Sequence, residues 1–285
     1  MPQEPAKMRS LGQYYRSGDW SDYWRTKVSM TEPHKLLIRG YPIEDIVENL
    51  SYAEALYLTV RGELPTKPQA RVLDACLTCI LDHQFIASHT PAARIVASAN
   101  PESIAAALAA GILCIGATTI APTDSARLAR ESVERMKKEK LSMQEVARQV
   151  VDQYVKAGKF IPGLGHPTHK NFDPRGDAVK RVAVKHKQWG VHCEMYEAIH
   201  DEFVKRTGKN LPINVDGRIA CVMCDLGFDY LEMAGLAAVA ILPGIIAHVV
   251  EEIKEGVPLR IIPNELGSKY IGAPERRLTK DQREK

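Results

Sequence analysis

Residues 161–175 read IPGLGHPTHKNFDPR, and no other stretch of the chain says more about its structure and chemistry. The glycines before His166 let the backbone approach a ligand closely, because glycine has no Cβ to clash with it. Arg175 carries a fixed cationic fork that suits a carboxylate or a phosphate. The stretch therefore predicts a loop that presents a histidine and an arginine to an anionic ligand.

A second segment, LPINVDG at residues 211–217, places the carboxylate of Asp216 on another turn bounded by proline and glycine. A histidine and an aspartate brought together from two such loops can transfer protons near neutral pH. The two segments together predict general acid–base chemistry around His166 and Asp216.

The composition is that of a globular protein with balanced charge. The chain has 285 residues, of which 45% are hydrophobic, and a formal net charge of +3. The balanced charge argues against a nucleic-acid partner or an anionic membrane surface. The hydrophobic content argues against disorder. The polar residues 1–19 lack the apolar core of a secretory signal, so we expect a cytoplasmic protein.

Two uncharged stretches and two cysteine pairs have alternative readings. Residues 103–122 and 234–250 are long enough to raise the question of a membrane span, but their alanine and glycine content favours buried helices. The CxxC pairs at 76–79 and 221–224 lie in helix-like apolar runs without the glycine-rich turns of zinc knuckles. We therefore expect buried core cysteines, with a zinc-binding scaffold as the alternative.

Helical periodicity dominates from residue 43 onward. A capping box at Ser51 predicts a helix that ends near Gly62, and Pro101-Glu102 suits a helix start. Residues 123–158 predict two amphipathic helices with a boundary near residues 141–142. Residues 177–207 predict further helix, broken at residues 189–190.

The two loop segments resemble the signatures of the citrate synthase superfamily, which are PGxGH with a DPR tail and then N-x-D-G. Further matches follow in the family's order, including RGYPIEDI at 39–46, GELPT at 62–66 and PGIIAH at 243–248. The resemblance runs from about Arg39 to Gly272. Several motifs in the right order make a chance match implausible.

The resemblance implies an all-α, citrate synthase-like fold: a large helical domain with an inserted small helical domain. On this chain the large domain would take residues 30–120 and 231–272, and the small domain 121–230. Residues 1–29 would form an aromatic-rich N-terminal arm, and residues 273–285 a charged tail.

The short region before Arg39 makes the chain similar to stand-alone citryl-CoA lyases and to the lyase module of ATP-citrate lyase. The implied function is a CoA-thioester carbon–carbon lyase that cleaves citryl-CoA, or a less carboxylated 3-hydroxyacyl-CoA, into acetyl-CoA and an oxo compound. The alternatives are a citrate or 2-methylcitrate synthase-type condensation and a non-catalytic CoA-binding subunit. The implied partners are an acyl-CoA and a second copy of the chain, in a homodimer or higher homo-oligomer.

The resemblance also assigns roles to individual residues. Asp216 would transfer the proton at the acyl α-carbon, and His166 would hydrogen-bond the oxygen at the carbon being made or broken. With coenzyme A as part of substrate and product, no metal is required. From spacing alone, Asp216 has an alternative role as the cap of a helix that begins near Arg218.

The remaining implied roles concern binding. Arg175 and His83 would contact substrate carboxylates, although His83 also fits a buried core histidine. Lys170 would bind a CoA phosphate or be a solvated surface lysine, and His169 would be a substrate contact or merely exposed. The loop backbone would lie along the adenine end of CoA, at Pro162, Gly163, Leu164 and Gly165.

Two positions depart from the family pattern. Thr119 stands where citrate synthases carry a histidine that stabilises the enol oxygen, and the hydroxyl of Thr118 or Thr119 is a weaker electrophile. Ile241 stands where the family has an arginine for a substrate carboxylate. Since isoleucine cannot pair with a carboxylate, we expect a substrate with one carboxylate fewer or with an apolar group at that place.

Overall fold

The computed structural model describes residues 9–116, 119, 122–279 and 282. Helices dominate the chain, and a single small sheet accompanies them in the described part, which confirms the predicted all-α class. Contacts divide the chain into two compact units, one of residues 1–80 and 120–240 and the other of residues 81–119 and 241–285. The domain limits drawn from the sequence stay a prediction.

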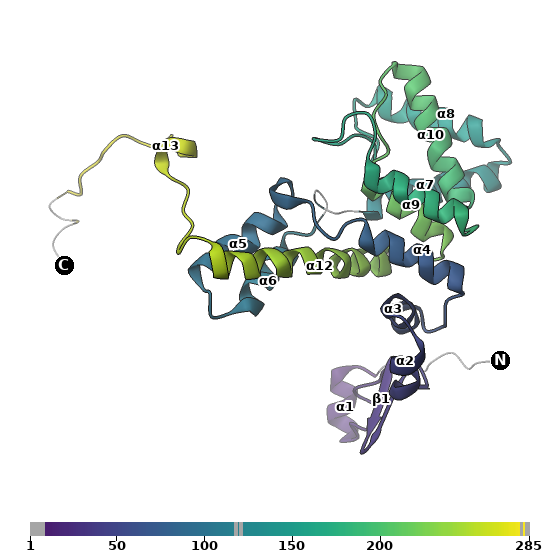
Figure 1. The fold of residues 1–285 in the computed structure, drawn as a ribbon, viewed down its shortest axis with the longest axis horizontal. Helices are drawn as coiled ribbons and strands as arrows, with labels where there is room; N and C mark the ends of the chain where they lie inside the picture. The colour runs from purple at the N-terminus through teal and green to yellow at the C-terminus, as the bar shows by residue number, and fades with distance from the viewer. Residues whose placement is uncertain (1–8, 117–118, 120–121, 280–281, 283–285) are drawn as a thin grey trace. The chain divides into compact units, whose positions relative to one another are not determined.

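The first unit begins with a small layer of helix and sheet (Figure 1). Helix α1 (Leu11–Ser17) precedes three antiparallel strands, β1 (Ser29–Glu32), β2 (Lys35–Ile38) and β3 (Tyr41–Pro42), and helix α2 (Ile43–Asn49) follows them. Tyr14 is fully buried, and its ring stacks on Trp20 with centroids 5.5 Å apart. The aromatic residues of the arm therefore pack largely on one another. Strands of two to four residues are too short to show an alternating pattern, so the sequence did not predict the sheet.

Local capping signals set the next helices. Helix α3 (Tyr52–Arg61) opens with the predicted capping box of Ser51 and Glu54 and ends at Gly62, whose φ is 82°. Helix α4 (Lys67–Thr78) opens with a second capping box, at Thr66. Each box satisfies backbone N–H groups that the first helical turn leaves without partners.

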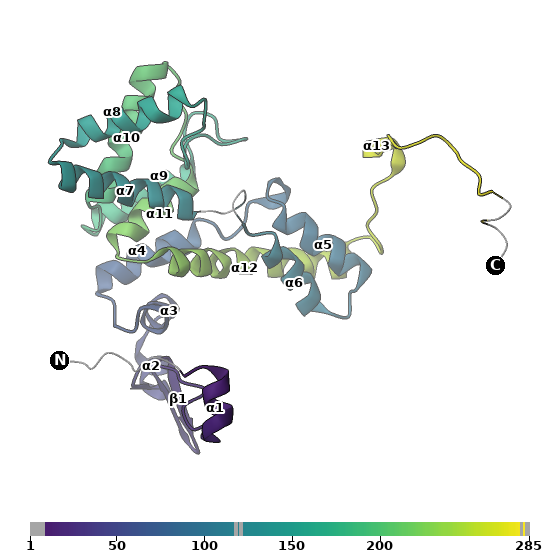
Figure 2. The same cartoon turned by 180° about the vertical axis from the view of Figure 1, so that it is seen from behind.

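Five helices complete the part of the first unit that matters for the site. They are α7 (Pro122–Glu139), α8 (Met143–Lys156), α9 (Pro174–Lys185), α10 (Val191–Thr207) and α11 (Val215–Asp225). The predicted boundaries near residues 141–142 and 189–190 are confirmed. Helix α11 packs against α7, α9 and α10 (Figure 2). Its side chains are buried along almost its whole length. Helix α11, which carries Asp216 in its first turn, is thus the centre of this group of helices.

The cysteine pairs lie on helices, as predicted. Cys76, Cys221 and Cys224 are buried, Cys79 is half-buried, and all of the chain's cysteines are free thiols. Burial raises the pKa of Cys224 to about 12. At neutral pH this side chain is therefore a small protonated core residue.

The second unit contains the 3₁₀ turn η1 (Gln84–Ile86), α5 (His89–Ala99), α6 (Ile104–Leu113), the later part of α12 (Tyr230–Glu255) and the short α13 (Asn264–Gly267). The prediction that Pro101-Glu102 opens α6 is wrong. The helix begins at Ile104, because the Ser103 side chain accepts a hydrogen bond from the Ala106 N–H and caps it there. A Cβ on Gly111 of α6 would lie 3.0 Å from Ile245, so α6 and α12 pack closely.

Helix α12 is long and apolar enough, by length and composition, to cross a membrane. Its buried residues nevertheless fall on one stripe, with 44% of the most apolar window buried. The stripe consists of Met233, Leu236, Ala237, Ala240, Ile241, Ile245 and Val249. A stripe of this period is typical of a helix that packs against a protein core.

Near its end α12 carries a buried carboxylate. Glu252 receives hydrogen bonds from Arg94 Nε and Arg260 Nε, each at 2.5 Å, and its side chain is fully buried. Burial alone would raise the pKa of Glu252, but the two guanidinium groups outweigh burial and lower it. The carboxylate therefore joins α5 and the segment after α12 to this helix.

We expect Glu252→Ala to cost about 3–5 kcal/mol of unfolding free energy, because it leaves the buried guanidinium of Arg94 without its main counter-charge. Urea unfolding measures this loss. Glu251→Ala is the control: its half-exposed side chain also contacts Arg94, at 3.2 Å, and its removal should cost less than about 1 kcal/mol. Equal losses in the two variants would contradict the structural role of Glu252.

Candidate active site

The two motif segments pair with each other in the structure. Leu164 and Ile213 form an antiparallel bridge. Asn214 donates from its backbone N–H to the Gly163 carbonyl and from its side-chain amide to the Gly165 carbonyl, both at 2.8 Å. The His166 loop and the start of α11 are therefore held together by the backbone, as the sequence predicted.

The glycine of the first motif also has a packing role. Gly163 has a φ of +77°, and a Cβ there would lie 2.7 Å from both the Gly217 Cα and the Ser125 Oγ. Gly217 needs the same closeness, since its own Cβ would lie 2.9 Å from the Gly163 carbonyl oxygen. The glycines thus let the loop rest directly on α11. The predicted approach of CoA to the loop backbone stays a prediction.

Asp216 lies in the first turn of α11 but does not cap it. The cap is Asn214, whose side-chain oxygen accepts a hydrogen bond from the Gly217 N–H at 3.1 Å. The alternative reading of Asp216 as a helix cap is therefore wrong. Because Asn214 prefers the non-helical backbone of a cap, the helix begins just before Asp216 and orients its side chain.

The carboxylate of Asp216 borders a narrow, almost wholly apolar cavity within the first unit. Part of its lining comes from Leu77 of α4, from Ile80 just after that helix, and from Ile219 and Met223 of α11. Most of the rest comes from α12. The remaining lining residues are Cys76, Pro122, Met233, Leu236, Ala237 and Ala240. A carboxyl group beside an apolar cavity is suited to proton transfer at a weakly acidic carbon, where alignment and exclusion of water matter most.

The pKa of the Cys79 thiol depends on several charged groups that lie near the end of α4. Burial raises the pKa of Cys79 to about 12; the charge of Arg175 acts in the opposite direction, and those of Asp173 and Asp216 add to the rise. Arg175, Asp173 and Asp216 therefore act on one thiol at the end of α4. The structure thus brings the predicted residues Arg175 and Asp216, together with Asp173, into one electrostatic environment.

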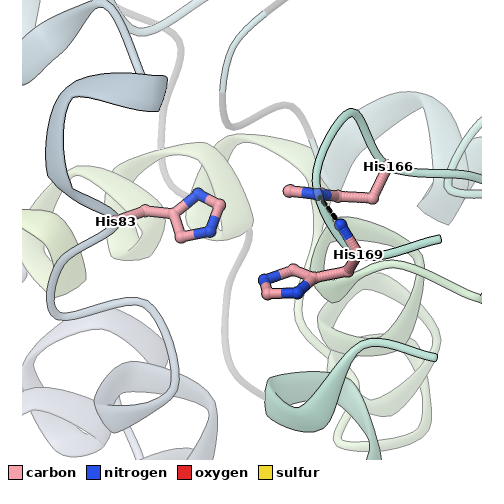
Figure 3. Close-up of side chains that lie close together, drawn as sticks. All are labelled: His83, His166 and His169. Carbon is pink, nitrogen blue, oxygen red and sulfur yellow. Dashed lines mark hydrogen bonds between the residues drawn. The ribbon is translucent and has the colours of Figure 1, made fainter.

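His166 is held by the backbone of its own loop. Its Nδ1 accepts hydrogen bonds from the N–H groups of Thr168 and His169, both at 3.0 Å. The His169 ring lies against the His166 ring, with centroids 4.6 Å apart and an interplanar angle of 31° (Figure 3). The backbone of the loop thus fixes the orientation of the His166 ring.

The other ring nitrogen of His166 lies beside a cation. The Arg175 Nη2 lies 3.3 Å from the His166 Nε2, and a guanidinium can only donate hydrogen bonds. Both ring nitrogens thus face N–H donors, and the predicted hydrogen bond between His166 and a substrate oxygen stays a prediction.

Arg175 is oriented by Asp173, a residue of the first motif to which the sequence assigns no role. Arg175 donates to the two Asp173 carboxylate oxygens from Nε at 3.0 Å and from Nη2 at 2.8 Å. The Val215 N–H also donates to this carboxylate, at 3.0 Å, which links it to α11. The Asp-Pro pair at the start of α9 was the available signal, since Asp173 is also the cap of that helix. The predicted contact of Arg175 with a substrate carboxylate stays a prediction.

Acidic pH should weaken this arrangement through Asp173. Burial alone would raise its pKa, but the hydrogen bonds and charge of Arg175 outweigh burial and lower it. Its stabilising contribution is therefore present above the unfolded pKa of about 3.9 and is lost as the pH falls through the folded pKa. We expect Asp173→Asn to cost about 3–5 kcal/mol at pH 7 and to flatten the acid limb of the stability–pH curve.

The measurement is urea unfolding between pH 7 and pH 3. Asp74→Asn is the control, since Asp74 forms a half-exposed pair with Arg71 in α4. It should leave both the stability at pH 7 and the shape of the curve nearly unchanged. An unaltered acid limb in Asp173→Asn would refute the assignment.

The other predicted residues are placed as follows. Lys170 is exposed on the His166 loop. His83, half-buried at the start of η1, Thr119, which bridges Gly116, and Ile241 belong to the second unit. Ile241 is 1% exposed, so its side chain is part of the buried stripe of α12. Thr118 lies outside the described residues.

Comparisons with known proteins identify the family. Residues 67–262 match the family model for the citrate synthase C-terminal domain. The chain is 35% identical in sequence to the citryl-CoA lyase from Hydrogenobacter thermophilus, with a TM-score of 0.83 over 92% of this chain and 99% of that one. It is 28% identical over 206 residues to citrate synthase 2 of Bacillus subtilis, covering 72% of this chain and 53% of that protein.

A third relative is the probable ATP-citrate synthase subunit 1 of Neurospora crassa, 30% identical over 243 residues, which cover 79% of this chain and 35% of that subunit. The chain thus spans about half the length, or less, of these curated relatives. The family model covers well over half of the chain and includes both motif segments. The chain belongs to the citrate synthase family.

Proposed function

We propose that this chain is a CoA-thioester carbon–carbon lyase that cleaves citryl-CoA, or a related, less carboxylated 3-hydroxyacyl-CoA, into acetyl-CoA and an oxo compound. The observation that carries the proposal is the backbone pairing of the loop that carries His166 with the start of α11, which carries Asp216 in its first turn. The likeness to a citryl-CoA lyase over almost the whole length of both chains supports the direction of the reaction.

In the proposed cleavage the bond between the acyl α-carbon and the carbinol carbon breaks. Its electron pair passes to the α-carbon, which becomes part of an enolate, and a proton delivered through Asp216 completes acetyl-CoA. The hydroxyl oxygen becomes the carbonyl oxygen of the second product and passes its proton to the imidazole of His166. The hydrogen bond between this ring and the oxygen stabilises the charge that develops there.

Coenzyme A enters the proposal through the substrate. Two solved ATP citrate lyase structures that share the fold were determined with (3S)-citryl-CoA and with citrate and coenzyme A. In this chain the exposed Lys170 lies on the His166 loop, where an ammonium group suits a CoA phosphate. We also propose a cytoplasmic homodimer or higher homo-oligomer that needs no metal and binds neither nucleic acid nor membrane, in keeping with the balanced charge.

The second candidate is condensation of an acyl-CoA with a 2-oxo acid. It is favoured by the likeness to citrate synthase 2 and by a short match, 45% identical over 58 residues, to a 2-methylcitrate synthase of Corynebacterium glutamicum. The same Asp216 would then remove the α-proton. Thr119, in place of the family histidine, supplies a weaker electrophile for that direction.

The deciding experiment measures acetyl-CoA release from citryl-CoA and from 3-hydroxyacyl-CoAs with fewer carboxylates. Turnover of any of them supports the lyase. Net citrate or methylcitrate formation with CoA release, and no cleavage, would favour the synthase. Tight acyl-CoA binding without turnover of either kind would leave the non-catalytic CoA-binding subunit.

Ile241 provides a test of substrate preference. We expect Ile241→Arg to shift the ratio of kcat/KM values toward citryl-CoA by about tenfold or more, because a charged hydrogen bond to a carboxylate is worth roughly 1.5–3 kcal/mol. The ratio of kcat/KM values for two substrates, measured on one protein preparation, does not depend on how much of the protein is folded. Partial unfolding caused by the buried charge therefore leaves this ratio unchanged. Ile241→Met, which adds no charge, should leave the ratio unchanged, and an unchanged ratio in both variants would exclude this position as the determinant.

A further inference from the structure

Helix α12 meets the turn at residues 81–86 through two residues that lie one helical turn apart. A Cβ on Gly244 would lie 3.0 Å from the Asp82 Cβ and would also strike the Leu81 carbonyl oxygen. Four residues later, the His248 Nε2 lies 3.0 Å from the Asp82 Oδ1. Both contacts lie within the second unit. The PGIIAH segment thus has a tertiary role: glycine allows the approach and histidine holds the turn.

The carboxylate of Asp82 controls the backbone on either side of His83. Its Oδ1 is held by His248, and its Oδ2 accepts a hydrogen bond from the Gln84 N–H at 3.0 Å. Gln84 has a φ of 55°, a left-handed conformation that a residue with a Cβ adopts at a cost. An aspartate that binds the N–H two residues on stabilises such a turn. The conformation next to His83 therefore depends on Asp82.

The orientation of His248 is determined in turn by buried charges. Its Nδ1 lies 3.4 Å from the Arg94 Nη1 and 3.7 Å from the Glu251 Oε2. Its Nε2 faces the Asp82 carboxylate, which can only accept, so Nε2 carries a proton and donates it to Asp82. Arg94 is itself fixed by the buried Glu252, and the Phe85 ring lies 5.6 Å from the His248 ring, centroid to centroid. The contacts run in an unbroken series from Glu252 to the turn that carries His83.

We propose that Asp82 and His248 are positioning residues for His83, and that they hold the 81–86 turn in the conformation in which His83 meets the carboxylated half of the substrate. The proposal rests on the proposed function, in which His83 contacts that part of the substrate. His248 acts through Asp82, and Asp82 acts through the backbone of the turn. The class of ligand is the oxo acid half of a 3-hydroxyacyl-CoA.

Amide hydrogen exchange of the peptide over residues 81–88 tests the positioning without any substrate. Asp82→Ala and His248→Ala should each speed exchange at the Gln84 amide about tenfold or more, because they remove its acceptor or loosen it. His248→Gln, whose side-chain amide can donate from a similar place, should restore most of the protection. His186→Ala, at the half-buried end of α9, is the control and should leave this peptide unaffected. Unchanged exchange in Asp82→Ala and His248→Ala overturns the proposal.

Steady-state kinetics test whether the positioning serves His83. His248→Ala should raise KM for the hydroxyacyl-CoA about tenfold with a smaller change in kcat, and His248→Gln should recover most of it. In a His83→Ala background the same His248→Ala change should have almost no further effect. Additive effects of the two changes would refute the link to His83. If the unmodified protein cleaves none of the substrates, the proposed function fails, while the exchange measurement still decides whether Asp82 and His248 order the turn.

Discussion

Replacing Asp216 with asparagine should lower kcat for acyl-CoA cleavage by about 10²–10⁴-fold, the usual contribution of a positioned general acid or base. The amide keeps the shape of the side chain at the start of α11 but transfers no proton. The cap of the helix is Asn214, so the helix itself should remain intact. Binding of CoA should stay within a few-fold of normal, because the proton transfer is needed only in the transition state. Single-turnover kinetics and calorimetric titration with CoA measure the two quantities.

A matched control lies on the neighbouring helix. Asp177 is also in the first turn of its helix, α9, but outside the apolar cavity, so Asp177→Asn should leave kcat nearly unchanged. If Asp216→Asn retained a normal kcat while the unmodified enzyme was active, the assignment of Asp216 would be wrong. A loss of both kcat and folding, by circular dichroism, would place Asp216 in the structure and not in the chemistry.

Gly163→Ala should destabilise the protein by roughly 2–5 kcal/mol, the combined cost of a left-handed alanine and an overpacked contact. The new Cβ would lie 2.7 Å from the Gly217 Cα, which is backbone and cannot move aside without shifting α11. Urea unfolding measures the loss, and activity should fall with it because the same loop carries His166.

Gly165→Ala separates the two costs. Gly165 has a φ of +87°, but the nearest atom to its Cβ, in Leu211, would be 3.6 Å away, an ordinary contact. This variant should lose only the conformational part, about 1–2 kcal/mol. Equal losses at the two glycines would show that the approach of the loop to α11 is not as close as the structure has it.

Sequence patterns predicted the parts of the fold that local interactions define. The capping box at Ser51 and the boundary near residues 141–142 place helix starts within a few residues, and the structure confirms both helices. The start of α6 was placed too early because Ser103, two residues after Pro101, provides the cap. The sheet of residues 29–42 was not foreseen, since its strands gain their stability from pairing with one another and leave little periodic signal.

For the candidate site, too, the sequence predicted some features and not others. Motif order alone was enough to predict that the His166 loop and the Asp216 turn meet, and the backbone pairing confirms it. It was not enough to show that Asn214, and not Asp216, caps α11. Both residues are good caps, and the choice between them depends on how the preceding loop packs.

The sequence by itself determined the family and the helical class, because these follow from residue types at short spacing along one chain; the chemical roles that it assigns to His166 and Asp216 stay predictions. The tertiary structure decided how those residues are oriented. Asp173 orients Arg175 beside His166, and His248 reaches Asp82 across 166 residues of sequence. The orientation of a side chain depends on which atoms lie within a few ångströms in space, and separation along the chain contains no record of that distance.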